Sequence, residues 1–267
     1  MTLENSTTPR GNGRGPVLRP GITVADGNHA NEGRRSHKTS ERVALEIVRD
    51  VVARGLRTGD HLPLEAAMVE EYRASRASVR EALRLLEVQG LIRLKPGPGG
   101  GPVVGSVDAA NLARTASLYF HLGAATYDQL LRTQALLEPV CAQLAALHPH
   151  RRTAMQPFLA PIDASIERAY HRHAQDFHST VYRLAANPVL TLLTQSVTHI
   201  VTDHVVAAMD PVELRSAIAH EHAVLGRAIA GGQSEEAGRI MGEHFRAQHD
   251  YYRHHWPARL RELIEWR

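Results

Sequence analysis

Hydrophobic residues begin to recur at helical spacing near residue 40 of the chain. Between residues 44 and 52 they mark one face of a helix. We expect this helix to begin after Thr39 or Ser40, since either side chain can cap it, and to end near Gly55. A second, shorter helix is predicted over residues 65–72, after a turn that contains glycine and proline.

A third helix is predicted from the segment ASRASVREALRLLEVQG, which spans residues 74–90. Its apolar positions Val79, Leu83 and Leu86 repeat at the spacing of a buried face. Arginines four residues apart form a second stripe on another side of the same helix: Arg76, Arg80 and Arg84. Such a stripe is typical either of an ordinary solvated face or of a helix that offers its guanidinium groups to a polyanion.

The segment after this helix predicts a β-hairpin. LIRLK alternates apolar and basic residues like a strand, PGPGGGP forms a glycine-rich turn, and VV begins the return strand. The order of helix, helix, short turn, helix and hairpin is that of a winged helix-turn-helix over residues 39–105. In this fold the helix after the turn enters the major groove of DNA.

In that setting the polar residues of the third helix gain candidate roles. A guanidinium can donate two hydrogen bonds to O6 and N7 of guanine or clamp a phosphate, and Arg84 lies deeper and should be more peripheral. Ser75 and Ser78 can cap the helix and also reach phosphates. Gly97 in the wing either lets the backbone approach DNA closely or belongs to an ordinary mobile loop.

The run GDHLPLEAAMVEEYRASRASVREALRLLEVQGLIRLKPGPGG resembles the DNA-binding domain of the GntR family of bacterial transcriptional regulators. The resemblance implies DNA contacts by Arg76, Ser78, Arg80 and the wing glycine Gly97. Two positions depart from the family pattern. Leu64 stands where the family has a helix-capping serine, and Ala66 stands where it has an arginine that often touches DNA. We expect the second change to lower affinity or alter base preference without abolishing binding.

Helical periodicity dominates the rest of the chain. Helices are expected over residues 109–121, 125–148, 154–170, 171–186, 188–208, 211–231 and 233–256. The predicted fold class is therefore mainly α, with the winged helix-turn-helix followed by an all-α antiparallel helical bundle over residues 106–256. Residues 1–38 are rich in Gly, Pro, Ser, Thr, Asn and Arg and predict a disordered tail, and residues 257–267 are expected to form a C-terminal tail.

Three histidines in the second half lie on apolar helix faces: His178, His222 and His244. One histidine on such a face is more often a core residue than a ligand. Three on three inward faces indicate a shared polar cavity instead, where neutral imidazoles could bind Zn²⁺ or a similar divalent metal. In a rival interpretation the histidines bind an organic ligand through hydrogen bonds without any metal.

This half also resembles the ligand-binding domain of the FadR-like subgroup of GntR regulators, called the FCD domain. The matching segments are LLEPVCAQLAA, FHSTVYRLAANPVL and EHAVLGRAIAGGQSEEAGRIMGEHF. The resemblance implies that the three histidines line an effector site and ligate a metal. The family's aspartate ligand is replaced by Ala174, and an arginine that faces the effector in many members is replaced by Gln134. The missing aspartate should weaken the metal site, leave the metal a full +2 charge and favour an anionic effector.

Composition and charge narrow the class of protein. A chain of 267 residues suggests about two domains, and fractions of 43% hydrophobic and 22% charged residues are ordinary for a globular protein. The single cysteine, Cys141, excludes an intramolecular disulfide and is expected to be buried. The absence of a long apolar run and of a signal core predicts a cytoplasmic protein. A net charge of +3 is too small to indicate nucleic-acid binding by itself.

Together these features predict a ligand-responsive transcriptional regulator, which we interpret as a repressor. It should bind a palindromic operator in double-stranded DNA as a homodimer, because two-fold symmetry in the protein is mirrored in the site. Two rivals belong to other classes. A metal-dependent enzyme could use the three histidines, although neither H-E-x-x-H nor a Ser-His-Asp signature is present. An architectural protein would coat DNA without specificity.

Overall fold

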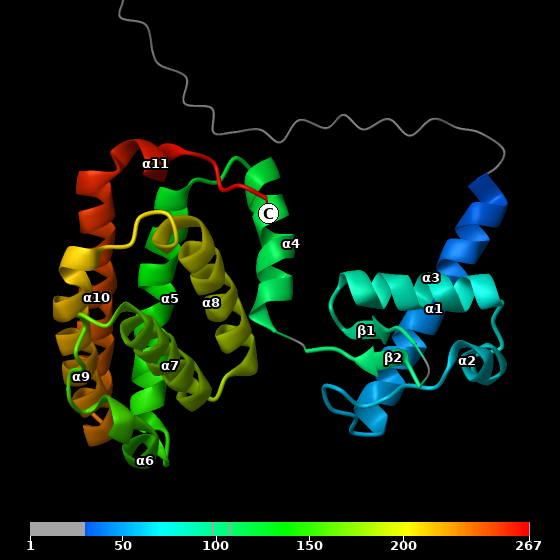
Figure 1. Ribbon diagram of the computed structural model, residues 1–267, viewed down its shortest axis with the longest axis horizontal. Helices are drawn as coiled ribbons and strands as arrows, with labels where there is room; N and C mark the ends of the chain where they lie inside the picture. Colours follow the sequence, from blue (N-terminus) through cyan, green and yellow to red (C-terminus); the bar gives the residue numbers. More distant parts are fainter. Residues whose placement is uncertain (1–29, 98, 107, 267) are drawn as a thin grey trace, which may run out of the picture.

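The computed structural model describes residues 30–97, 99–106 and 108–266, with side chains from residue 37 onward. Its helices and strands form a smaller unit, α1–α3 with β1 and β2, and a larger unit, α4–α11 (Figure 1). This order confirms the predicted fold class. A disordered tail was expected over residues 1–38. Its first 29 residues lie outside the described part of the chain.

The smaller unit is a winged helix-turn-helix. It consists of α1 (Ala30–Ala53), α2 (Glu65–Glu71), α3 (Arg76–Val88), β1 (Ile92–Lys95) and β2 (Gly101–Val104). Its core joins all three helices to the hairpin through buried side chains such as Ile47, Met68 and Leu83. The two strands pair antiparallel, with Ile92 opposite Val104. The periodicity of α3 is thus explained, because its apolar stripe packs against α1 and α2.

Helix α1 begins earlier than the sequence predicted. It starts at Ala30 instead of after Thr39 or Ser40. Ser40 is buried inside the helix, and its hydroxyl donates to the carbonyl oxygen of His37 at 2.8 Å. Serine can bond to the preceding helical turn in this way as well as cap a helix, so its presence did not mark a helix start.

The larger unit is an antiparallel bundle around the long helix α5. Its α-helices are α4 (Ala109–Leu122), α5 (Tyr127–Leu147), α6 (Arg151–Met155), α7 (Glu167–Ala185), α8 (Pro188–Val201), α9 (Arg215–Gly231), α10 (Ser234–His255) and α11 (Pro257–Arg261). Short 3-10 helices lie at Gln156–Phe158 and Val212–Leu214, and a π-helical turn lies at Thr202–Val206. Helix α5 packs against α7, α8, α9 and α10, which surround it in Figure 1.

The expected helices over residues 154–170 and 171–186 were wrong in their division. A single helix, α7, runs from Glu167 to Ala185, and no α-helix spans residues 159–166 of the described chain. Pro161 lies in this stretch and disfavours a continuous helix. Asp163 closes a local turn instead, because its Oδ1 accepts from the Ser165 amide at 2.9 Å.

The predicted C-terminal tail over residues 257–267 is part of the fold as far as residue 266. Leu260 and Ile264 are buried. The Ile264 amide donates to the carbonyl oxygen of Ala125 at 2.9 Å, just before α5 begins. The apolar residues at this end therefore anchor the last segment of the chain to the bundle.

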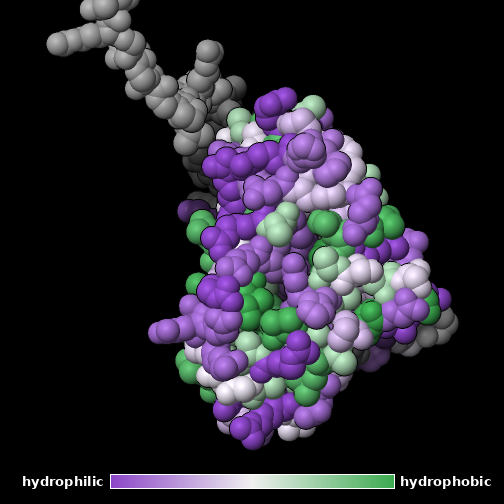
Figure 2. All heavy atoms as spheres, turned by 90° about the vertical axis from the view of Figure 1, so that its left-hand side faces the viewer, coloured by the Kyte–Doolittle hydropathy of each residue, from purple (hydrophilic) through white to green (hydrophobic). Residues whose placement is uncertain are grey.

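No helix among the described residues is long and apolar enough to cross a membrane. Figure 2 shows the side of the larger unit on which α9 and α10 lie in Figure 1. Hydrophilic side chains cover most of this face, and hydrophobic ones gather near its middle.

Candidate DNA-binding helix and histidine cavity

Helix α3 is fixed at its start by a serine cap. The Ser75 hydroxyl oxygen accepts a hydrogen bond from the Ser78 amide at 3.1 Å, as the sequence predicted. Val79, Leu83 and Leu86 are all buried. The helix is therefore held by one face and by its N-terminus, which leaves its other sides free to present side chains.

The predicted arginine stripe lies on a neighbouring side of the helix, and Arg76, Arg80 and Arg84 are all exposed. Arg80 Nε donates to Glu65 Oε2 at 2.8 Å, which ties it to the first residue of α2. Arg84 Nη1 lies 4.0 Å from Glu81 Oε2. The stripe thus combines one positioned guanidinium with neighbours that extend into solvent.

Ser78 does not share this exposed position. It is buried, and its hydroxyl oxygen lies 2.9 Å from that of Ser75. Its side chain is thus part of the helix cap and is not presented on the exposed face of α3.

The hairpin turn between β1 and β2 has the backbone shape of a tight wing. Gly97 has φ +93°, and its carbonyl oxygen accepts from the Gly100 amide at 2.9 Å. A Cβ atom at Gly100 would lie 2.3 Å from the Lys95 carbonyl oxygen, so this turn requires glycine. Arg93 and Lys95 on β1 are exposed near the turn and add positive charge.

The two departures from the family pattern lie at the start of α2. Leu64 occupies the N-cap and makes no side-chain cap hydrogen bond. Ala66 is exposed and carries no group that can bind a base or a phosphate. The expected loss of a cap at Leu64 is confirmed.

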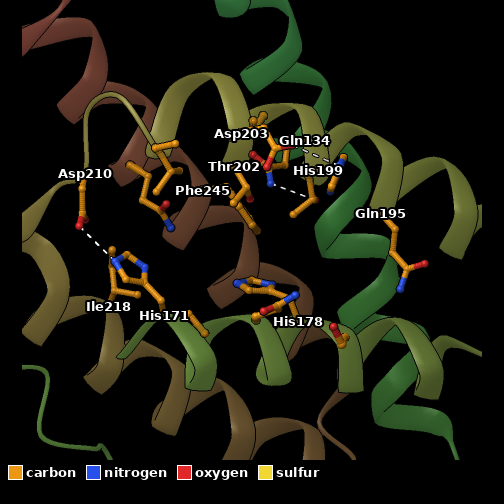
Figure 3. A pocket seen from close by; sticks show the side chains of 18 of the residues that line it. Gln134, His171, His178, Gln195, His199, Thr202, Asp203, Asp210, Ile218 and Phe245 are labelled. Carbon is orange, nitrogen blue, oxygen red and sulfur yellow. Dashed lines mark hydrogen bonds and ion pairs between the residues drawn. The ribbon is translucent and has the colours of Figure 1, made fainter. Parts of the chain in front are cut away.

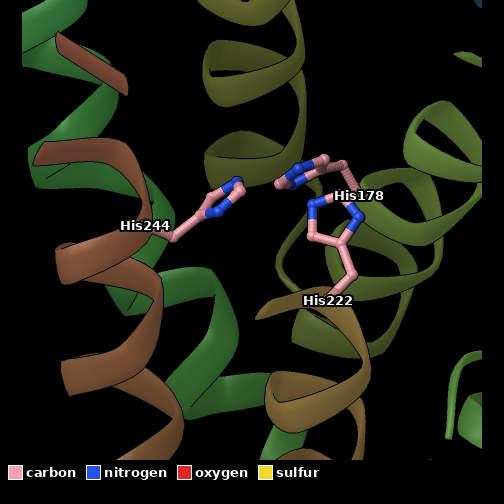
Figure 4. Close-up of side chains that lie close together, drawn as sticks. All are labelled: His178, His222 and His244. Carbon is pink, nitrogen blue, oxygen red and sulfur yellow. The ribbon is translucent and has the colours of Figure 1, made fainter. Parts of the chain in front are cut away.

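The three predicted histidines converge from three helices. His178 lies on α7, His222 on α9 and His244 on α10, and their rings meet between these helices (Figure 4). The ring centroid of His222 is 5.0 Å from that of His178 and 4.9 Å from that of His244. One nitrogen of each ring lies within 4.8 Å of the other two, which is close enough for a shared metal ion.

The surroundings of these rings favour the neutral imidazole. Burial, reinforced by the neighbouring histidines, lowers the pKa of His222 well below its ordinary value. Burial also lowers the pKa of His244, although the adjacent Glu221 carboxylate acts in the opposite direction. Neutral imidazole is the form that ligates a metal, so burial favours the protonation state that metal binding requires.

The hydrogen bonds of the rings differ. Both ring nitrogens of His222 and Nδ1 of His178 are buried without a partner among the described residues. His244 Nδ1 lies 2.7 Å from Glu221 Oε2, and its Nε2 lies 2.7 Å from Gln248 Nε2. Unsatisfied buried polar atoms are costly, so these nitrogens are suited to pair with a ligand.

Gln134 lies near this cluster but pairs with a neighbouring helix. It is buried on α5, and its Nε2 donates to Thr198 Oγ1 on α8 at 3.1 Å. Thr198 Oγ1 donates in turn to Glu138 Oε1 at 3.1 Å. Glu138 is a residue that the sequence reasoning did not assign to the site. The sequence feature that could have identified it is a single acidic residue inside the apolar segment LLEPVCAQLAA, because such an acid is expected to be buried.

The three histidines, Gln134, Thr198 and Gln248 line one cavity of about 770 Å³, whereas Glu138 and Glu221 lie behind its lining (Figure 3). The cavity is bounded by α5, α7, α8, α9 and α10 and by residues 108–110 before and within the first turn of α4. Ala174 lines it where the family's aspartate would stand. The lining includes four carboxylates, Asp108, Glu167, Asp203 and Asp210, and no lysine or arginine among the described residues.

A second cluster, at the other end of the cavity, already contains an arginine that pairs with its acidic side chains. Glu167, His171 and Asp210 also offer atoms within 4.8 Å of one another. However, Arg215 Nη2 donates to Asp210 Oδ2 and lies 3.6 Å from Glu167 Oε1. His171 Nε2 lies 3.2 Å from Asp210 Oδ2, as Figure 3 shows. The guanidinium supplies the positive charge that a cation would bring, so this cluster is an ion-pair network.

Comparisons with known proteins agree with this geometry. The chain matches the family model described as "Bacterial regulatory proteins, gntR family" over residues 39–100, and that described as "FCD domain" over residues 129–247. The Glc operon transcriptional activator of Escherichia coli (strain K12) is 27% identical over 222 residues, which cover 77% of this chain and 85% of that protein. The mannosyl-D-glycerate transport/metabolism system repressor MngR of the same strain is 41% identical over 64 residues, which cover 24% of this chain and 27% of MngR.

A solved structure shows the same fold. Streptococcus agalactiae GntR superimposes with a TM-score of 0.56 at 19% identity, covering 79% of this chain and 99% of that chain. The two family matches together span about two thirds of the sequence and coincide with the two units of the fold. The chain therefore belongs to the GntR family of bacterial regulatory proteins and carries an FCD effector-binding domain, which makes it a DNA-binding transcriptional regulator.

Proposed function

We propose that this regulator represses metabolic genes by binding a short palindromic operator as a homodimer, and that a small anionic effector in the helical domain modulates or releases it. One observation carries the proposal, namely that a single chain joins two complementary surfaces. These are the exposed arginine stripe of α3 and a cavity of about 770 Å³ in the bundle. The stripe suits duplex DNA, and the cavity suits a small molecule.

At the DNA, Arg76 and Arg80 are assigned to guanine edges or to phosphates, since a guanidinium can make two parallel hydrogen bonds to either. Arg84 is assigned to the periphery of the interface. Ser75 at the helix start and Gly97 in the wing are assigned to the DNA backbone, because both are exposed and can approach phosphates.

We infer a homodimer from the small size of the surface that one α3 helix presents to DNA. One recognition helix covers only a few base pairs, so a second copy is needed for a site that is rare in a genome. We assign the dimer contact to the helical domain. We propose repression because MngR is named a repressor. Its match to this chain is shorter, at 64 residues, but its identity of 41% is higher than the 27% of the Glc operon activator. The relative named an activator covers more of the chain, so a reporter assay is needed to determine the sign.

In the cavity, His178, His222 and His244 would hold a divalent metal such as Zn²⁺. The residues fit this role because the pKa of His222 is low and both nitrogens of its ring are buried without a partner. When bound, the metal supplies a positive charge and an open coordination position in the cavity wall. A metal-free cavity, in which the histidines bond directly to an organic ligand, is the rival.

The charge of the cavity supports an effector that depends on this metal. The lining residues include carboxylates but no lysine or arginine, and Gln134 replaces the family's arginine. In the metal-free protein a carboxylate or phosphate effector would therefore meet no lysine or arginine among these lining residues. A divalent metal held by the three histidines would supply a positive charge for such an effector, besides the Arg215 guanidinium that already pairs with Asp210 and Glu167.

Helix α4 connects the cavity to the DNA-binding unit. Residues 108–110 line the cavity, and the Ala109 carbonyl oxygen accepts from Ser196 Oγ at 3.2 Å. One turn along α4, Arg114 Nη2 donates to the carbonyl oxygen of Val88, the last residue of α3, at 3.2 Å. An effector that shifts the first turn of α4 would therefore displace the end of the recognition helix.

Gel shifts with DNA that flanks the gene for this protein test the proposal. We expect a specific complex that survives excess random DNA. It should weaken when Zn²⁺ and one of a panel of small carboxylates are added together, and the carboxylate should have no effect after the metal is removed. Random DNA that competes as well as the unlabelled fragment would instead indicate a non-specific architectural protein.

A further inference from the structure

A buried acid lies directly behind the histidine site. Glu138, in the middle of α5, is 0% exposed. Its Oε1 accepts hydrogen bonds from the Tyr182 hydroxyl and from Thr198 Oγ1. Its Oε2 has no hydrogen-bond partner among the described residues. A carboxylate that is fully removed from water is expensive unless both of its oxygens are satisfied.

The unsatisfied oxygen faces a histidine of the site. Glu138 Oε2 lies 3.6 Å from His178 Nδ1, which is also buried without a hydrogen-bond partner. This distance is slightly beyond a direct hydrogen bond. A small rotation of the imidazole would let Nδ1–H donate to the carboxylate and would satisfy both atoms at once.

His244 shows the completed form of the same arrangement. Its Nδ1 lies 2.7 Å from Glu221 Oε2, and its Nε2 accepts from the Gln248 amide nitrogen at 2.7 Å. A carboxylate can only accept, so it requires the proton on Nδ1 and leaves the lone pair on Nε2. Two of the three histidines therefore have an acid next to Nδ1, and the bond that the acid makes selects the tautomer.

We propose that Glu138 is a positioning residue of the histidine site. It accepts a hydrogen bond from His178 Nδ1–H, turns the Nε2 lone pair toward His222 and His244, and brings from α5 the negative charge that Ala174 does not provide on α7. Glu138 acts through His178 and is not itself a ligand, since no oxygen of it belongs to the group of atoms that lie within 4.8 Å of one another. An acid behind a ligating histidine makes that ligand more basic and fixes its ring. The inference deepens the proposed metal site and depends on it for its function.

The tautomer of His178 tests the inference without any metal. In metal-free protein labelled with ¹⁵N, a long-range proton–nitrogen spectrum distinguishes Nδ1–H from Nε2–H imidazoles. The His178 signals can be assigned by their absence from a His178→Gln variant. We expect Nδ1–H in the wild type and a change toward Nε2–H in Glu138→Gln, whose amide could donate to Nδ1. A wild-type His178 that carries its proton on Nε2 would overturn the inference.

Metal affinity provides the second measurement. Competition with a chromogenic chelator should show Zn²⁺ binding about 10- to 100-fold weaker in Glu138→Gln than in the wild type. Glu243→Gln is the matched control, because it removes one carboxylate from α10 at a side chain that is 55% exposed and paired with Arg239. Equal affinities in wild type and Glu138→Gln would contradict the role of Glu138. A wild type that binds no Zn²⁺ but shows the expected tautomer would refute the metal site and support the positioning of His178.

Discussion

Arg80 Nε donates to Glu65 Oε2 at 2.8 Å and so joins the recognition helix to the start of α2. The two side chains are 59% and 36% exposed, and a pair this exposed adds little to stability. Its effect is geometric. Because this pair engages Nε, the Nη1 and Nη2 groups remain available for a bidentate contact.

The first prediction concerns this contact. Arg80→Ala should cost about 1–3 kcal/mol of specific DNA binding if the guanidinium is bidentate to guanine. Fluorescence anisotropy with operator and random duplexes measures both affinities. Arg239→Ala, an exposed arginine on α10, serves as the control for lost charge. If operator and random affinities fall equally, Arg80 contacts a phosphate, and if neither falls, the assignment of α3 to DNA is wrong.

The recognition helix and the histidine cluster could both be predicted from the sequence for one physical reason. Helical periodicity determines which side chains share a face, so the stripe of Arg76, Arg80 and Arg84 and the inward positions of the histidines followed from spacing. The arrangement of α1–α3 and the hairpin followed from turn residues and from the family resemblance.

Other features depended on contacts that periodicity does not encode. Glu138 meets His178 across 40 positions of sequence, and the depth of α5 in the bundle, which spacing does not give, determines that contact. Ser40 and Ser78 have side chains typical of caps or DNA contacts, but their burial changes their roles. The start of α7 at Glu167, ahead of the expected boundary at residue 171, reflects where the chain turns around Asp163.

The second prediction is that purified protein retains about one divalent metal per chain after dialysis, because three neutral imidazoles suffice for a Zn²⁺ site. His222→Ala should lose the metal, while His220→Ala, an exposed histidine on the same helix, should keep it. Metal at 100 times its dissociation constant would stabilise the folded protein by about 2.7 kcal/mol, visible as a higher Tm. Equal and sub-stoichiometric metal in all three proteins would falsify the metal site and leave the cavity as a metal-free one.

The third prediction compares two glycines of α9. A Cβ atom at Gly226 would lie 2.4 Å from the Phe158 carbonyl oxygen, so Gly226→Ala must displace backbone and should cost about 1–3 kcal/mol. At Gly231 the nearest atom would be 3.7 Å away, and alanine there should be neutral or stabilise by up to about 1 kcal/mol. Thermal unfolding of both variants checks the packing of α9, and a Gly226→Ala protein as stable as the wild type would contradict it.

The fourth prediction concerns Cys141. Burial raises the pKa of its thiol to about 11, so roughly one molecule in a thousand carries the thiolate at pH 8. A thiol reagent at pH 8 should therefore label the folded protein slowly and the urea-unfolded protein rapidly, with Cys141→Ser as the blank. Rapid labelling of the folded protein would show that α5 is more open than described.

The central claim is that this protein reads a specific, two-fold symmetric DNA sequence through α3. Binding selection from a library of random duplexes, followed by sequencing of the retained DNA, tests it most directly. We expect enrichment of one short palindrome by the wild type, with the enriched duplex bound by two chains in sedimentation and with enrichment lost in the Arg76→Ala, Arg80→Ala double variant. A wild type that enriches no motif, or that binds its motif as a single chain, would show that α3 does not read a two-fold symmetric site.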